Sequence, residues 1–304
     1  MQSIKRNLVP TMAEWRPSSS EIHMSADINI GAILKRGVNF LVDSTLFCAV
    51  VPAVITFTTI ILTKNLFSWL LVLLPFFACV FIYSLNRLTD RNEDKINQPN
   101  RIRFPHRIRI TLVVISLIFY ILLLAIVFQK NFLSFAIALL PLVIAILYSF
   151  FRLKRFLLVK NFSIATAICA SVLIVPAYYD NWTGDWGILF LFFFFMILTN
   201  TILFDIKDIK GDSVFGIHTL PVRFGVTATK KICYFLVAAA FFIIIPLFSM
   251  NSEGILLIPF ACTLALSTIY APECENPPWW YFGFLVDGEY WILLFSTLIV
   301  TILQ

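Results

Sequence analysis

Charged residues are scarce in this sequence. Of its 304 residues, 13% are Asp, Glu, Lys or Arg, against about a quarter in an average soluble domain, and 60% are hydrophobic. This composition excludes an intrinsically disordered chain and an ordinary soluble enzyme. Glycine and proline are also sparse, at ten and fourteen residues, which excludes a collagen-like or low-complexity chain.

Cysteine and histidine offer little recognisable chemistry. The six cysteines contain no CxxC pair and lie mostly in apolar stretches, so we interpret them as small hydrophobic side chains. The three histidines show no HExxH or similar spacing, which argues against a zinc site.

Long apolar runs dominate the sequence. A helix that crosses a membrane needs about 20 mostly apolar residues. The stretches that meet this requirement are residues 38–62, 66–88, 108–129, 132–150, 162–180, 186–206, 230–249, 254–270 and 281–303. We therefore predict an all-α fold, a polytopic membrane bundle of about nine transmembrane helices.

Positive charge is distributed asymmetrically between the two sides of these spans. All of the 23 Lys and Arg residues except Lys64 and Lys130 fall in the N-terminal segment and in the connections after the second, fourth and sixth spans. Because cytoplasmic loops carry an excess of Lys and Arg, we predict that the N-terminus and these connections are cytoplasmic. Residues 1–35 then form a polar cytoplasmic segment ahead of a transmembrane domain at 36–304. The net charge of +6 follows from this topology and requires no nucleic-acid partner.

Acidic residues gather at two predicted helix ends, of which the first follows the second span. The sequence there is NRLTDRNEDKINQPNR, residues 86–101. Asn86, Asp90 and Asp94 are four residues apart, a spacing that places all three on one face of a helix.

The second acidic segment follows the sixth span and repeats this arrangement. Its sequence is LFDIKDIKGDSVFGIHTLPVRFG, residues 203–225. Asp205, Asp208 and Asp212 are separated by three and four residues, which again predicts one helix face. Like charges at this spacing repel each other, so both clusters require a compensating cation.

Two interpretations of the acidic segments differ in what neutralises them. Solvated loop faces with surface ion pairs would not explain why two separate helix ends repeat the same arrangement. We favour clusters that face each other and bind Mg²⁺, which prefers carboxylate and phosphate oxygens. Nearby Lys and Arg would bind the remaining oxygens of a diphosphate ester. Departure of the diphosphate group from this ester would leave a carbocation, which aromatic side chains would stabilise.

The motifs resemble those of the UbiA-type intramembrane prenyltransferases. The first segment is similar to the family's NDxxDxxxD, followed by NxPxR from Asn97 to Arg101. The second is similar to DxxxD with a trailing GxxTLPVRxG. A third match, YSxxRLKR with a following asparagine, begins at Tyr148 and ends at Asn161. The resemblance covers about residues 35–300, with the three motifs in the expected order.

This resemblance implies a bundle around a central cavity, where two Mg²⁺ ions bridge the acidic motifs and an isoprenoid diphosphate. The implied metal ligands are Asn86, Asp90, Asp94, Asp205, Asp208 and Asp212. The catalytic role is implied for Asp90, Asp94, Asp208 and Asp212. Substrate contacts are implied for Asn86, Arg101, Tyr148, Lys154, Arg155 and Asn161.

Acceptor recognition depends on features outside the aligned acids. Asp43 lies inside the first predicted span, where an acid is a functional hypothesis by default. It would contact the acceptor or act as a base, unless it is a capped interior polar group. Two departures from the family pattern, Arg87 where Asp is usual and the loop IRFPHRIRI after Arg101, lie near where an acceptor would be held.

The expected function is Mg²⁺-dependent transfer of an isoprenoid group from a polyprenyl diphosphate to a lipophilic or aromatic acceptor, with the donor entering from membrane lipid. This makes the chain a prenyltransferase. Cyclisation of the prenyl cation to a terpene, which some family members perform, is an alternative. An ion-coupled transporter is a remote alternative, because transporters usually show two related halves with a site near mid-span.

Overall fold

The structure is a computed structural model of the chain. It describes residues 37, 40, 41, 43–89, 95–97, 104–150, 156–182, 185–250, 252–271 and 281–303. The chain divides into two units, residues 1–39 and 40–304, and the elements below belong to the second. Every regular element among the described residues is helical, which confirms the predicted all-α fold.

Each predicted span overlaps one long helix of the described chain. In order these are α2 (Leu46–Leu62), α3 (Trp69–Thr89), α5 (His106–Lys130), α6 (Phe132–Phe150), α7 (Val159–Tyr179), α8 (Asp185–Lys207), α10 (Leu220–Met250), α11 (Leu257–Ile269) and α12 (Asp287–Leu303). The shorter elements are the helix α9 (Ile209–Val214), the 3-10 helix η3 (Ser252–Leu256) and the π-helix η4 (Tyr281–Val286).

The length and surface of the helices identify an integral membrane protein. Within the described residues, α3, α5, α7, α8 and α10 are long and apolar enough to cross a membrane, and α2, α6 and α11 belong to shorter apolar helices. On α5 the side chains of Ile118, Ile121 and Phe128 are more than half exposed. Contiguous apolar surface of this kind is suited to lipid rather than water. The exact number of nine spans stays a prediction.

The first membrane helix begins later than the sequence indicates. Thr45 has a left-handed backbone (φ 70°), which a β-branched residue rarely adopts and which separates α2 from the preceding residues. The Thr45 hydroxyl is 3.0 Å from that of Ser84 on α3, a contact that holds this break against the bundle. Since α2 starts at Leu46, Asp43 lies in a helical stretch just before this break, and its place inside the first membrane span stays a prediction.

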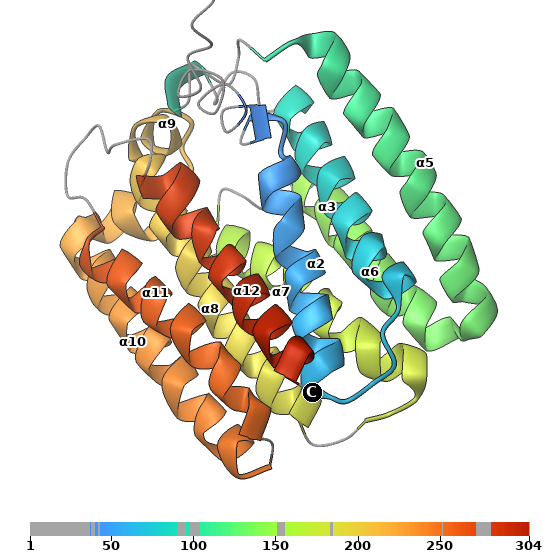
Figure 1. The fold of residues 1–304 in the computed structure, drawn as a ribbon. Helices are drawn as coiled ribbons and strands as arrows, with labels where there is room; N and C mark the ends of the chain where they lie inside the picture. Colours follow the sequence, from blue (N-terminus) through green and yellow to red (C-terminus); the bar gives the residue numbers. More distant parts are fainter. Residues whose placement is uncertain are drawn as a thin grey trace, which may run out of the picture. The chain divides into compact units, whose positions relative to one another are not determined.

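Helix α8 is the most enclosed of the five long apolar helices. In its most apolar stretch 61% of the residues are buried, against 22% in α5. It packs against α7 on one side and α10 on the other, and α5 lies at the edge of the bundle (Figure 1). Phe192 and Phe193 are fully buried and contact the ring of Phe260 on α11. The second acidic segment therefore starts from a helix that its neighbours hold in place.

A pocket lies between α2, α3, α6 and α7. Its empty volume is about 710 Å³, including its open side. Pro52, Pro75 and Pro141 line it, each inside a helix. A proline within a helix removes one backbone hydrogen bond and bends the helix. The small side chains of Ala78, Ala145 and Ala167 in the same walls leave room for the pocket.

Candidate active site

The second acidic segment forms the junction between α8 and α9. Asp205 lies in the last turn of α8, Asp208 lies between the two helices, and Asp212 lies within α9. The Asp208 backbone N–H donates to the Asp205 carbonyl three residues earlier, a tight turn that ends α8 at Lys207. The expectation of one continuous helix face is therefore corrected. The carboxylates converge across a junction between two helices.

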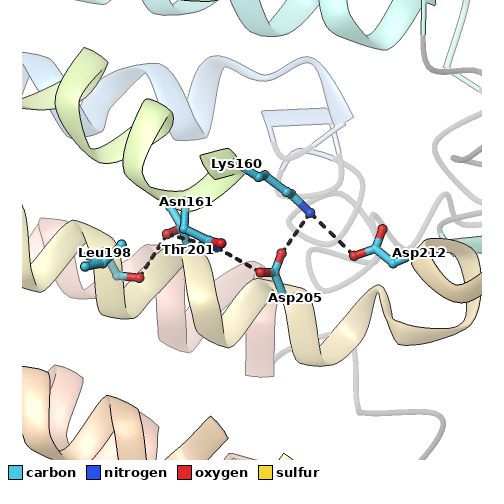
Figure 2. A network of polar contacts seen from close by, with 6 residues as sticks. All are labelled: Lys160, Asn161, Leu198, Thr201, Asp205 and Asp212. Atoms are coloured by element: carbon cyan, nitrogen blue, oxygen red, sulfur yellow. Dashed lines mark hydrogen bonds and ion pairs between the residues drawn. The ribbon is translucent and has the colours of Figure 1, made fainter. Parts of the chain in front are cut away.

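Lys160, in the first turn of α7, connects the two ends of this segment (Figure 2). Its Nζ lies 2.8 Å from Asp205 Oδ1 and 3.6 Å from Asp212 Oδ2. Both carboxylates are buried, at 1% and 4% exposure, and the lysine side chain is 19% exposed. The Asp208 carboxylate and the Tyr148 hydroxyl also interact electrostatically with this ammonium. One cation thus bridges two buried carboxylates.

The role of Lys160 was missed by the sequence analysis. The apolar run predicts a fifth span that begins at residue 162, which leaves Lys160 among the loop cations on the positively charged side. Helix α7 in fact begins at Val159, which carries Lys160 into the bundle. The signal that would have found it is its position next to the motif residue Asn161.

Asn161 engages the other oxygen of Asp205. Its Nδ2 donates to Asp205 Oδ2 at 2.8 Å and lies 3.4 Å from Thr201 Oγ1, whose own hydroxyl donates to the Leu198 carbonyl (Figure 2). Consecutive residues of α7 therefore bind both oxygens of Asp205, so this carboxylate joins α7 to the end of α8.

Asp208 differs from Asp205 and Asp212 in its contacts, because the ion pairs described for Lys160 are with those two neighbours. Oδ1 of Asp208 is buried, and among the described residues it has no hydrogen-bond partner. A buried carboxylate oxygen is costly unless something binds it. Carboxylate oxygens are the ligands that Mg²⁺ prefers, so this atom fits a metal site.

The first acidic segment is only partly described. Asn86 lies in the last turn of α3 and lines the pocket together with Tyr148 and Ser163. The remaining predicted site residues lie outside the described residues: Asp90, Asp94, Arg101, Lys154 and Arg155. Within the described ranges, no three His, Cys, Asp or Glu side chains are arranged to hold a metal ion alone.

A hydrogen bond between described residues joins the two acidic segments. The Gly211 backbone N–H of α9 donates to Asn97 Oδ1 at 2.8 Å. The approach is so close that a Cβ added to Gly211 would lie 2.3 Å from that oxygen. The asparagine of the NxPxR motif therefore contacts the turn that carries Asp212.

Known proteins provide the comparison for this geometry. The model of the UbiA prenyltransferase family matches residues 45–274. The chain belongs to this family.

Similarity to individual relatives is partial. Digeranylgeranylglyceryl phosphate synthases of Sulfurisphaera tokodaii and Methanococcus aeolicus are 34% and 31% identical to the chain over 155 residues. These matches cover 48% and 50% of the chain and 54% of each relative. The chain therefore spans about half the length of the curated relatives that it matches.

Solved structures share the fold of the UbiA protein described here. A UbiA homolog from Aeropyrum pernix K1, solved as an apo structure, has a TM-score of 0.63 at 16% identity, covering 84% of this chain and 98% of its own. A UbiA homolog from Archaeoglobus fulgidus bound to GPP and Mg²⁺ has a TM-score of 0.64 at 18% identity, covering 86% and 98%.

The glycines of the family motif GxxTLPVRxG have a backbone explanation in this UbiA protein. Gly216 (φ 66°) and Gly225 (φ 77°) both adopt left-handed conformations that glycine tolerates without strain. Gly216 follows α9, where the Ile217 N–H returns to the Asp212 carbonyl at 2.8 Å. Gly225 forms a kink within α10. Both conformations shape the chain around the second acidic segment.

The unusual residues after the first motif have a structural role. Arg109, from the IRFPHRIRI loop, is buried and donates to the carbonyl of Arg87 at 3.3 Å. Its guanidinium also lies 5.4 Å from the ring centre of Phe104. These contacts hold the start of α5 against the end of α3.

Two further buried acids, on α12, were not identified from the sequence. Glu289 is fully buried, and its Oε1 accepts a hydrogen bond from Asn200 Nδ2 of α8 at 2.8 Å. Asp287 is buried beside Cys48, whose Sγ is 3.8 Å from Oδ2. The criterion applied to Asp43, an acid within an apolar span, identifies both.

Replacing Gly211 by alanine tests the link between the acidic segments. Gly211→Ala forces the Asn97 side chain away and removes its hydrogen bond, which costs about 1–3 kcal/mol. We expect a thermal midpoint several degrees lower and reduced turnover in the purified protein. Gly187→Ala in α8 is the matched control, because an added Cβ there meets nothing within 4 Å. Wild-type behaviour of Gly211→Ala would show that the contact with Asn97 is dispensable.

Proposed function

We propose that this protein is a Mg²⁺-dependent prenyltransferase that moves an isoprenoid group from a polyprenyl diphosphate to a lipophilic or aromatic acceptor in the membrane. The observation that carries the proposal is an acidic cluster beside the polar end of an apolar pocket. Asn86 and Tyr148 line the pocket near the ends of α3 and α6, and Ser163 lies one turn from Lys160. Such a site suits a substrate with a charged head and an apolar tail.

The polar head would be bound by the two acidic segments through Mg²⁺. The proposed ligands are Asn86, Asp90 and Asp94 on one side and Asp205, Asp208 and Asp212 on the other. Bound Mg²⁺ would stabilise negative charge on the departing diphosphate. The buried Asp208 Oδ1, which has no hydrogen-bond partner among the described residues, supports this assignment.

Cations and polar groups of the chain would position the diphosphate. We assign its remaining oxygens to Arg101, Lys154 and Arg155, with Tyr148 near the bond that breaks. Asn161 would act through Asp205, to which it is bonded at 2.8 Å. The apolar pocket would take the isoprenoid chain from membrane lipid and exclude water from the reacting carbon. By the positive-inside rule this site is on the cytoplasmic side, together with the N-terminus and residues 1–35.

The acceptor is the less constrained substrate. The curated relatives are named digeranylgeranylglyceryl phosphate synthases, so a prenylated glyceryl phosphate is the first acceptor to test. Asp43, just before α2, is assigned to acceptor binding.

The test is a product analysis with the purified protein. Radiolabelled prenyl diphosphates of several lengths are incubated with Mg²⁺ and either a prenylated glyceryl phosphate or a total lipid extract, and the product masses are measured. The expected product is the acceptor plus one prenyl group, with release of diphosphate. A cyclic hydrocarbon formed without acceptor would indicate terpene cyclisation instead. No diphosphate release with any donor would overturn the proposal.

A further inference from the structure

We propose that Lys160 is a built-in counter-ion of the second acidic segment, which Mg²⁺ and diphosphate displace from the carboxylates when they bind. The inference rests on the proposed function and adds a competition between a side chain and the metal at one site. In the metal-free protein Lys160 neutralises the cluster. In the loaded protein its ammonium moves to a diphosphate oxygen.

The contacts of Lys160 show why a metal would compete with it. Its ammonium is 2.8 Å from Asp205 Oδ1 and 3.6 Å from Asp212 Oδ2, and both acids are on the predicted list of metal ligands. A divalent cation bonded to either carboxylate would lie beside this ammonium. Two cations so close together in a buried site repel each other strongly. The carboxylates therefore favour one occupant or the other.

The chemistry of lysine suits a displaceable counter-ion. Its ammonium is a point charge on a flexible stem with three rotatable donors, whereas the planar fork of arginine would bind a carboxylate through two parallel bonds. The side chain is 19% exposed, so it retains a path away from the acids. Asn161 donates to Oδ2 of Asp205, whereas the ammonium contacts Oδ1, so displacing the ammonium need not break this hydrogen bond. The carboxylate thus stays oriented while the cation beside it changes.

Exchange of this kind would couple metal binding to diphosphate binding. Without diphosphate, the metal must displace the Lys160 ammonium from the carboxylates while no phosphate oxygens are present to bind that ammonium. With diphosphate, the ammonium gains phosphate oxygens as partners, and the carboxylates become free for the metal. We therefore expect the wild-type protein to bind a divalent metal weakly by itself and much more tightly with diphosphate.

The experiment measures Mn²⁺ binding to the full chain in detergent by electron paramagnetic resonance, first alone and then with inorganic diphosphate. Lys160→Met should tighten binding of Mn²⁺ alone by about tenfold or more, because the competitor is gone. The matched control is Lys207→Met, which removes a cation from the end of α8 whose ammonium lies over the rings of Phe204 and Phe282. It should bind Mn²⁺ like the wild type. With diphosphate, the advantage of Lys160→Met should disappear.

Thermal stability provides a second readout. Without metal, Lys160→Met should unfold at a temperature lower by about 5 °C or more, because buried carboxylates lose their cation. Saturating Mn²⁺ with diphosphate should close this gap. A gap of equal size in the loaded protein would overturn the inference, since Lys160 would then be a permanent structural partner.

Lys160→Arg keeps the inference testable if the methionine variant does not fold. The arginine should hold the carboxylates more firmly and weaken binding of Mn²⁺ alone by several-fold. Unchanged Mn²⁺ affinity in both variants would overturn the competition while leaving the proposed function intact. A wild-type protein that binds no Mn²⁺ with or without diphosphate would overturn the proposed function itself.

Discussion

Asp208→Asn is expected to lower turnover by about two to three orders of magnitude while leaving the fold intact. The substitution keeps the size of the side chain and removes the negative charge that a metal ligand supplies, a loss of several kcal/mol in the transition state. Oδ1 of Asp208 is buried without a hydrogen-bond partner among the described residues, so the substitution breaks no hydrogen bond described for that atom. The measurement is diphosphate release per mole of purified protein, with the thermal midpoint recorded on the same sample.

Asp185→Asn is the matched control for this prediction. Asp185 lies in the first turn of the same helix, α8, at the end opposite to the acidic segment. This variant should keep wild-type turnover. Near-native rates from Asp208→Asn at matched protein concentration would remove Asp208 from the metal site and leave it as a half-buried surface acid.

Removing divalent metal is expected to abolish diphosphate release altogether. Acids from two helix ends cannot hold a diphosphate directly, because their charges repel it. Excess EDTA should therefore reduce the rate to background, and added Mg²⁺ should restore it. Ca²⁺, which is larger and accepts more irregular coordination, should restore less activity. Full activity in excess chelator would assign neutralisation of the diphosphate to the lysines and arginines of the chain.

Helix positions were predictable from the sequence because the bilayer imposes a length on every spanning segment. Runs of about 20 apolar residues have few other stable environments, so each predicted span overlaps a helix of the described chain. Helix ends were less predictable, because they depend on individual backbone conformations. The left-handed Thr45 moves the start of α2 past Asp43, and the early start of α7 brings Lys160 into the bundle.

The candidate site was also predicted only in part: the sequence identified its acidic residues but not the backbone geometry that brings them together. Motif spacing selected Asp205, Asp208 and Asp212 as one group, and the family resemblance placed Asn161 in a separate, third motif. The spacing also predicted a single helix face, which the turn at Asp208 replaces with a junction. Helical periodicity describes one regular helix, so it carries no information about where that helix bends.

Apolar runs, charge asymmetry and motif spacing determined the fold class, the family and the set of acids, because these properties are local or simply additive along the chain. Only the tertiary structure decided which groups neutralise those acids. Lysines at many positions satisfy the positive-inside bias equally well, so this bias does not distinguish Lys160 from Lys207. Packing of α7 against α8 makes the distinction, because it brings the Lys160 ammonium to 2.8 Å from Asp205 and leaves that of Lys207 over aromatic rings.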